Sequence, residues 1–153
     1  MTDRERESKK RWLMSHKWID QRIKFLEREE ERLTLAVYPS APAYDGISHA
    51  PRGSGRKELS DYVIKIENAR ARVTRMKERW IERREEIISA IMALDDKEAT
   101  LLALKYLECR HWTDCAFMLG YADPRPLYPI HTRALERLKI PEYTDTVLYG
   151  RDE

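Results

Sequence analysis

The chain has 153 residues, of which 37% are charged and only five are glycine, a composition that favours long helices over a glycine-punctuated β fold. The formal net charge of +2 neither requires nor excludes a nucleic-acid partner. No run of about 18 apolar residues is present, so we expect no contact with a membrane. The N-terminal sequence MTDRERESKKRW lacks the apolar stretch of a signal peptide, so we expect a cytoplasmic protein.

Residues 1–37 form one polar block without proline, which predicts a long N-terminal helix. Apolar residues recur along this block in a narrow, heptad-like stripe. The members of the stripe are Trp12, Ile19, Ile23, Leu26 and Leu33. His16 and Glu30 interrupt it where further apolar residues would fall. Because the stripe is narrow, the helix needs a partner that covers it.

Residues 38–56 hold prolines, glycines and serines without any period, which predicts a flexible linker. Residues 57–94 predict a second long helix, because apolar residues keep a spacing of about 3.5. The partner of this helix is either the first helix of the same chain or a helix of another subunit. We expect a homo-oligomer, with an intrachain hairpin as the alternative. The residues expected at the subunit contact are Ile19, Ile23, Leu26, Leu59, Val63, Ile66, Val73 and Trp80.

Nothing in the sequence indicates an enzyme or a metal site. Cys109, His111 and Cys115 lie close together in CRHWTDC, but their spacing matches no common zinc pattern. The chain shows no nucleophile beside a base and no paired carboxylates in an apolar setting. The sequence GSG at residues 53–55 is too short to cradle a phosphate. We therefore expect no catalysis, no metal and no cofactor.

Residues 95–140 predict three short helices, and residues 141–153 a tail. The first helix starts at an acidic cap, Asp95 or Asp96, and runs through the apolar residues of LDDKEATLLALKYLE. The second lies in HWTDCAFMLG, with Thr113 as its N-cap and Gly120 at its end. The apolar stripe of the third is Leu127, Ile130, Ala134, Leu135 and Leu138, which we expect to pack against Leu104, Cys115 and Leu119.

Three prolines crowd the start of the third helix: Pro124, Pro126 and Pro129. If Asp123 were the N-cap, Pro129 would fall inside the helix, where it would break a hydrogen bond and clash at a cost of about 3 kcal/mol. We therefore expect the regular helix to begin near Tyr128, with Pro129 as its first residue and DPRPL as an extended or turn segment. The rigid proline cluster would hold Arg125 and Tyr128 at the groove without an ordering cost on binding. The alternative to this role is a truncated recognition helix that reads DNA poorly or not at all.

This order of helices is the helix-turn-helix plan, in which the last helix enters the major groove of double-stranded DNA. Between residues 95 and 140 basic and acidic residues balance, but four bases at the last helix face only Glu136. Arg125 is the predicted base-reading residue, because a guanidinium can pair bidentately with guanine. Other DNA contacts are expected from Tyr128, Thr132, Arg133, Arg137, Lys139, Arg110, His111 and Thr113. For His131 we expect a packing role.

The predicted helix-turn-helix, residues 95–140, resembles region 4 of sigma-70-type factors. The similarity rests on Leu102, Tyr106, Trp112, Cys115 with Ala116, Leu119 with Gly120, and Ala134, Leu135 and Leu138. The element YPIHTRAL is similar to one in small phage regulators of the RinA/ArpU type, which also carry an N-terminal helix, a Gly/Pro/Ser-rich loop and a long charged helix. Cys115 replaces their usual isoleucine, and Pro126 and Pro129 replace polar residues.

Together, pattern and resemblance predict an all-α protein with two long helices in a coiled-coil-like arm and a C-terminal helix-turn-helix domain like sigma region 4. The resemblance implies a phage or prophage transcriptional regulator. It would activate late or packaging genes by bringing bacterial RNA polymerase to a promoter. Two alternatives stay open: a small-terminase-like subunit that recognises DNA for packaging, and a helical protein-binding module without DNA readout.

Overall fold

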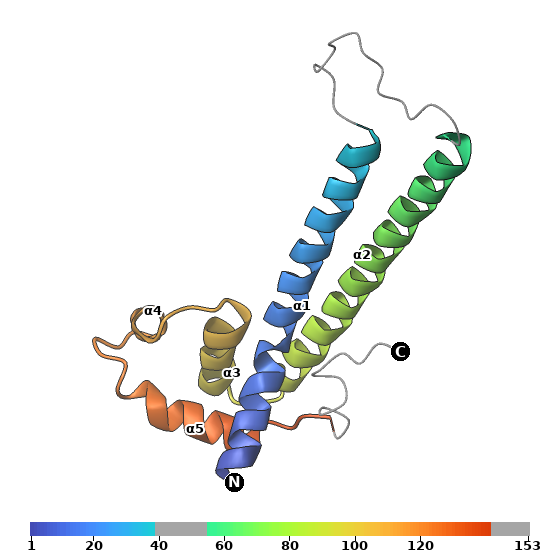
Figure 1. Cartoon of the computed structure of the whole chain (residues 1–153). Coiled ribbons are helices and arrows are strands. Elements are labelled where there is room, and N and C mark those ends of the chain that lie inside the picture. The colour runs from blue at the N-terminus through green and yellow to red at the C-terminus, as the bar shows by residue number, and fades with distance from the viewer. Residues whose placement is uncertain (39–54, 142–153) are drawn as a thin grey trace. The chain divides into compact units, whose positions relative to one another are not determined.

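The computed structural model describes residues 1–38 and 55–141, and all regular structure in these ranges is helical (Figure 1). The long helices are α1 (Asp3–Val37) and α2 (Gly55–Met92). The short ones are α3 (Asp96–Leu102), which continues into the π-helical turn η1 (Ala103–Leu107), then α4 (Trp112–Met118) and α5 (Leu127–Arg137). None of the described helices combines the length and the apolar character needed to cross a membrane. The predicted all-α class is confirmed.

The predicted helix boundaries agree with the structure at both long helices. Helix α1 ends at Val37 as predicted, and α2 lies two residues before its predicted range of 57–94 at each end. The first turn of α2 therefore includes the last two residues of the predicted linker, 38–56. Residues 39–54 of that linker and residues 142–153 of the predicted tail lie outside the described residues.

The chain divides into two compact units. The central unit is Ile19–Trp80, and the terminal unit combines Met1–Trp18 with Ile81–Glu153. Both long helices are therefore shared between the two units.

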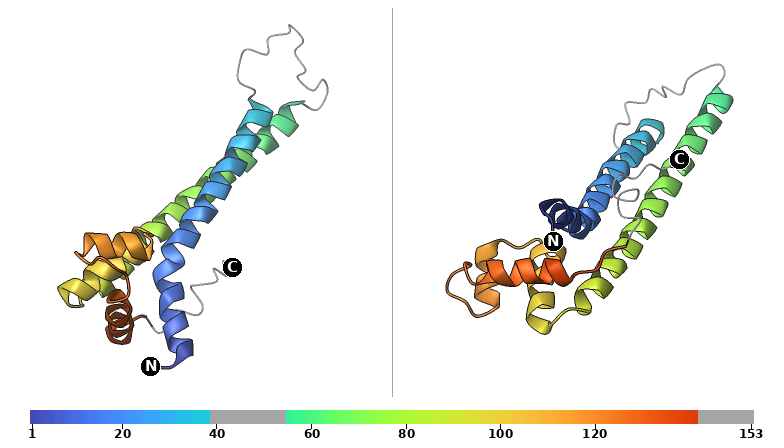
Figure 2. Two further views of the ribbon diagram at one scale, coloured as in Figure 1. Left: turned by 90° about the vertical axis from the view of Figure 1, so that its left-hand side faces the viewer. Right: turned by 90° about the horizontal axis from the view of Figure 1, so that it is seen from below.

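Within the central unit, the α1 and α2 segments run antiparallel, side by side (Figures 1 and 2). Ion pairs join them: Glu30 Oε1 lies 2.9 Å from Arg70 Nε, and Glu27 Oε1 lies 2.9 Å from Lys77 Nζ. Glu30 interrupts the apolar stripe in the sequence, and the Arg70 guanidinium is the reason that a carboxylate suits this position. The partner stripe of the first helix is thus supplied by the same chain.

The residues expected at a subunit contact differ in their burial. Ile23, Ile66 and Val73 are buried within one chain, so no second copy is needed to remove them from water. Ile19, Leu26, Val63 and Trp80 are partly buried, and Leu59 is 47% exposed. Homo-oligomerisation stays a prediction, but the three buried residues are occupied by contacts in their own hairpin.

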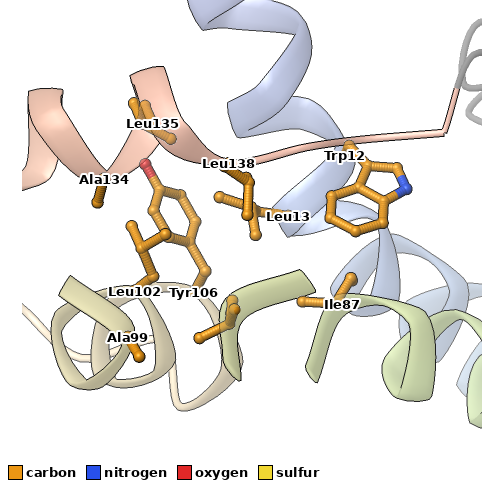
Figure 3. Packing of buried hydrophobic residues seen from close by; sticks show 10 residues of the cluster. Trp12, Leu13, Ile87, Ala99, Leu102, Tyr106, Ala134, Leu135 and Leu138 are labelled. Atoms are coloured by element: carbon orange, nitrogen blue, oxygen red, sulfur yellow. The ribbon is translucent and has the colours of Figure 1, made fainter. Parts of the chain in front are cut away.

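The terminal unit has a core to which all its long and short helices except α4 contribute, here called the first core cluster. Its buried members are Trp12, Leu13, Ile87, Ile91, Ala99, Leu102, Tyr106, Ala134, Leu135 and Leu138. Figure 3 shows Trp12 and Leu13 of α1 packed between α2 and the end of α5. The first turns of α1 therefore belong to the core of the unit that carries the predicted helix-turn-helix.

Helix α1 also caps the C-terminal end of α5 through Lys9. Its ammonium Nζ donates hydrogen bonds to the carbonyl oxygens of Leu135 at 2.7 Å and of Glu136 at 3.3 Å. Carbonyls in the last turn of a helix have no intrahelical partner, and a cation there also complements the helix dipole. Partial burial lowers the pKa of Lys9. This long-range contact has no signal in the sequence.

Replacing Lys9 by methionine is expected to lower the free energy of unfolding by about 1 kcal/mol, because both carbonyls lose a charged donor. Lys10→Met is the matched control, since Lys10 Nζ lies 3.1 Å from Glu7 in a surface ion pair within α1 and no hydrogen bond joins it to α5 among the described residues. That control should cost less than about 0.5 kcal/mol. Urea denaturation followed by circular dichroism gives both values, and equal effects would contradict the capping role.

His16, the other interruption of the stripe in α1, has a defined partner in η1. Its side chain is 4% exposed, and its Nε2–H donates to the carbonyl oxygen of Tyr106 at 2.6 Å. Tyr106 lies in the last turn of η1, where carbonyls have no intrahelical partner, so its carbonyl is available to His16. A buried polar residue at this position is thus explained by a buried acceptor.

Candidate nucleic-acid interface

Helix α4 ends in a glycine turn that sets the direction of the chain towards α5. Gly120 has a φ of +82°, a value that favours glycine. The N–H of Tyr121 donates to the Ala116 carbonyl at 2.8 Å, and the N–H of Gly120 donates to the Phe117 carbonyl at 3.1 Å. These two bonds are those of a Schellman motif. The predicted end of the second short helix at Gly120 is confirmed.

The predicted N-cap of this helix, Thr113, is wrong. The Cys115 N–H donates to the His111 carbonyl at 3.0 Å, so His111, in an extended conformation, is the N-cap and Trp112 is the first helical residue. Thr113 is exposed in the first turn. The cap therefore lies two residues earlier than the sequence pattern indicated.

A second core cluster holds α3, η1, α4 and the start of α5 together. Its buried members are Leu101, Leu104, Cys115, Ala116 and Leu127, with Trp112, Leu119, Tyr121 and Ile130 packed against them. The predicted contacts of Leu127 and Ile130 with this cluster are confirmed. The rest of the α5 stripe, Ala134, Leu135 and Leu138, instead enters the first core cluster beside Trp12. Helix α5 thus bridges two cores, where the sequence predicted one.

The three prolines around the start of α5 do not remove any hydrogen bond from the helix. The helix begins at Leu127 with Pro126 as its N-cap, so Pro129 is the third helical residue. Residues in the first turn of a helix have N–H groups without intrahelical partners, and proline loses nothing there. The start near Tyr128 is confirmed, although Pro129 is not the first residue. Before the helix, the Leu127 N–H bonds to the Pro124 carbonyl at 2.9 Å in a turn.

Aromatic contacts join the start of α4 to the start of α5. The Trp112 ring meets the Tyr128 ring edge-on, with centroids 5.0 Å apart, and the Lys105 ammonium lies 4.9 Å from the Trp112 centroid. Arg110, His111 and Thr113 at the start of α4 are exposed, as is Tyr128. The contact therefore brings these four predicted DNA-binding residues to neighbouring helix starts. Sequence reasoning missed Lys105, whose signal was a base among the apolar residues of LLALKYL.

His131 is a packing residue, as predicted. It is 8% exposed, its Nε2 lies 2.7 Å from the Tyr106 hydroxyl, and its ring stacks on that of Tyr106 at 5.8 Å. Burial lowers the pKa of His131 to about 4, aided by nearby cations, and burial also raises the pKa of Tyr106. We therefore assign a neutral imidazole that accepts the tyrosine proton in a hydrogen bond.

Acids from other elements lie beside the bases of α5, which the count along the sequence did not include. Arg137 Nη1 lies 2.7 Å from Asp95 Oδ2 and 3.2 Å from Glu98 Oε1. Arg133 Nε lies 4.0 Å from the same oxygen of Glu98, a residue that is 4% exposed. Asp95 is the N-cap of α3 as predicted, but its side chain binds Arg137 and makes no capping bond.

Arg125 lies in the turn before α5 with its side chain 84% exposed. Asp123, which sequence reasoning considered only as a helix cap, holds it at three points. The Arg125 N–H donates to Asp123 Oδ1 at 2.8 Å, while Nε and Nη2 donate to Oδ2 at 2.9 and 2.7 Å. The pKa of Asp123 is lowered by these hydrogen bonds from Arg125.

The remaining residues that were predicted to contact DNA differ in their exposure and in their hydrogen-bond or ion-pair partners. Thr132 is partly buried, and its hydroxyl donates to the Tyr128 carbonyl at 3.0 Å, which occupies its donor. Lys139 is exposed beyond the end of α5, and Arg110 Nη2 lies 3.3 Å from Glu108 Oε1. Of the two cysteines, Cys115 is buried and Cys109 is exposed.

Two apolar side chains of α4 were missed as surface features. Phe117 is 84% exposed and Met118 is 51% exposed, although both lie in the segment CAFM, which suggests burial. Their helix faces its core with Cys115 and Ala116, so the next two positions turn outward.

A search of family models, curated proteins and solved structures finds none that matches this chain.

Proposed function

We propose that this protein is a sequence-specific regulator that binds double-stranded DNA through α4, the Gly120 turn and α5. One observation carries the proposal: the Trp112–Tyr128 contact and the second core cluster fix the starts of α4 and α5 side by side, with Arg125 exposed before α5. Residues at the start of the second helix are those that reach base edges in a helix-turn-helix complex. The residues at the start of α4 would contact phosphates.

The ion pairs of Arg133 and Arg137 are compatible with this function. Both arginine side chains are more than half exposed, at 55% and 52%. The Arg137–Asp95 pair joins two exposed side chains, and such pairs contribute about 0–1 kcal/mol, so a DNA phosphate can replace Asp95 at little cost. Glu98 is buried and would keep its contacts with both arginines. Basic and acidic residues balance between residues 95 and 140. We therefore expect the affinity for DNA to depend on a few positioned contacts and only moderately on salt concentration.

The finer proposal follows the resemblance to RinA/ArpU-type regulators and sigma region 4. The terminal unit would act as the sigma-like DNA-binding domain, and the paired helices of the central unit as a coiled-coil-like arm for assembly into a homo-oligomer. The protein would then activate late or packaging genes of a phage or prophage by bringing RNA polymerase to the promoter. The ion-paired helices of the central unit support an extended arm, and the sequence motifs support the family.

Fluorescence anisotropy with duplex DNA tests the proposed function. Fragments from the region around the gene are titrated in increasing salt against a scrambled competitor. We expect one fragment to bind at least about a thousandfold more tightly than the scrambled DNA. Its affinity should fall linearly with salt on a logarithmic plot. Equally weak binding to every fragment would contradict sequence-specific recognition.

Replacing Arg125 by alanine is expected to reduce the preference for the cognate fragment by about 1–3 kcal/mol, because a bidentate contact with guanine is lost. Arg72→Ala is the matched control, since Arg72 is an exposed arginine of α2 in the central unit. The ratio of cognate to scrambled affinity, measured by anisotropy, should not change in the control. An unchanged ratio in the Arg125 variant would remove this residue from base readout.

The exposed apolar residues of α4 favour one other function, a helical protein-binding module. Phe117 and Met118 present apolar surface that DNA phosphates do not require. If no DNA fragment is preferred, this face becomes the first candidate for a protein contact. A small-terminase-like role is distinguished by light scattering, because a ring of eight or more copies would favour packaging and a dimer would favour transcription.

A further inference from the structure

We propose that Asp123 is a positioning residue that aims the guanidinium of Arg125 at a guanine, and so sets base preference without touching DNA itself. This inference rests on the proposed DNA-binding function and deepens it. It starts from the three hydrogen bonds that one carboxylate accepts from one arginine, from its backbone N–H and from its Nε and Nη2.

The pattern of these bonds leaves the correct edge of the guanidinium available. Arginine has donors along one side, Nε and Nη2, and at its far end, Nη1 and Nη2. Asp123 Oδ2 takes the side edge, at 2.9 Å from Nε and 2.7 Å from Nη2. Among the described residues, no acceptor is bonded to Nη1. The far end can therefore donate two parallel hydrogen bonds to O6 and N7 of guanine while the carboxylate still holds the side edge.

The backbone around Arg125 restricts its movement further. Pro124 and Pro126 flank it and fix their own φ angles. The Tyr128 N–H bonds to the Arg125 carbonyl at 3.3 Å, which ties this residue to the first turn of α5. A long side chain normally loses rotamer freedom when it binds, and a side chain that is already held loses less. The two flanking prolines and Asp123 would thus act together in the placement of one guanidinium.

Asparagine at position 123 separates this role from that of shaping the turn. The amide oxygen of Asp123→Asn can still accept the Arg125 N–H, but the carboxylate oxygen that binds Nε and Nη2 is replaced by an NH₂ group. The matched control is Asp114→Asn on α4, an exposed acid whose replacement removes the same charge. Loss of a negative charge near DNA should strengthen binding to every sequence alike.

The experiment is selection from a random duplex library with the wild type, Asp123→Asn, Arg125→Ala, the double variant and the control, followed by anisotropy on the enriched sites. We expect the wild type to enrich a motif that contains a guanine. Asp123→Asn should lose about tenfold in preference at that guanine only, while its affinity for scrambled DNA holds or rises. The double variant should lose no more than Arg125→Ala alone.

Three results would overturn the inference. Asp123→Asn could keep the guanine preference and strengthen all binding, as the control does, which would make Asp123 only a repulsive charge. The double variant could lose more than Arg125→Ala, which would mean that Asp123 acts independently. If the wild type enriches no motif, the proposed function fails as well. The wild-type selection therefore separates the two failures, and melting temperatures confirm that each variant is folded.

Discussion

Replacing Trp12 by alanine is expected to lower the free energy of unfolding by about 3–5 kcal/mol, a large share of the stability of an ordinary domain. The Trp12 side chain is 1% exposed and packs in the first core cluster with residues of α2 and α5. Removal of a buried indole loses its transfer free energy and leaves a cavity among side chains that relax only in part. The measurement is urea denaturation followed by circular dichroism.

Trp18 provides the matched control in the same helix and the same unit. It is 58% exposed, so Trp18→Ala should change the free energy of unfolding by less than about 0.5 kcal/mol. Two similar values would show that the first turns of α1 are not part of the core. The expected contrast would show that an isolated C-terminal fragment lacks part of its own core, since Trp12 lies outside residues 95–140.

Acid is expected to destabilise the terminal unit through His131. Its pKa is lowered to about 4 in the folded chain, against about 6.5 in an unfolded one, so the unfolded state binds the proton more readily. The stability that neutral His131 contributes is complete above pH of about 6.5. It is lost as the pH falls towards about 4, and below that pH the group adds no further change. The full difference amounts to about 3 kcal/mol.

Comparison with His131→Gln isolates this effect from the titration of other groups. Glutamine keeps an acceptor for the Tyr106 hydroxyl but does not titrate in this range. Between pH 7.5 and pH 4.5 the wild type should lose about 2–3 kcal/mol more than the variant, measured by urea denaturation at each pH. Parallel curves for the two proteins would show that the imidazole is not held neutral by the fold.

The local order of helices was predictable because it depends on periods and breakers that act within a few residues. The long helices ended within two residues of their predicted boundaries, and Gly120 ended α4 as its turn chemistry requires. The position of Pro129 in the first turn of α5 also followed from the local cost of proline in a helix. The exception was the cap of α4, which is set by the backbone at His111 and not by the nearest hydroxyl.

The candidate site was only partly predictable, because its charges depend on long-range neighbours. The sequence places a single acid, Glu136, among the bases of the last helix. The fold brings Glu98 and Asp95 from the start of α3 to Arg133 and Arg137. The Asp123–Arg125 pair, in contrast, joins residues two positions apart in the turn. The net charge counted along the helix therefore did not predict the net charge of the surface around it, to which other elements contribute.

The sequence by itself determined the helical class, the ends of the two long helices to within two residues, and the glycine and proline turns, because backbone propensity and hydrophobic period are local properties. Only the tertiary structure decided which helices share a core. Trp12 and Lys9 joined α5 through contacts more than a hundred residues apart in the chain, and Glu30 found Arg70 across a hairpin. Such contacts depend on which helix faces pack against each other. The sequence pattern of one helix shows that it has an apolar face, but it does not identify the helix that covers this face.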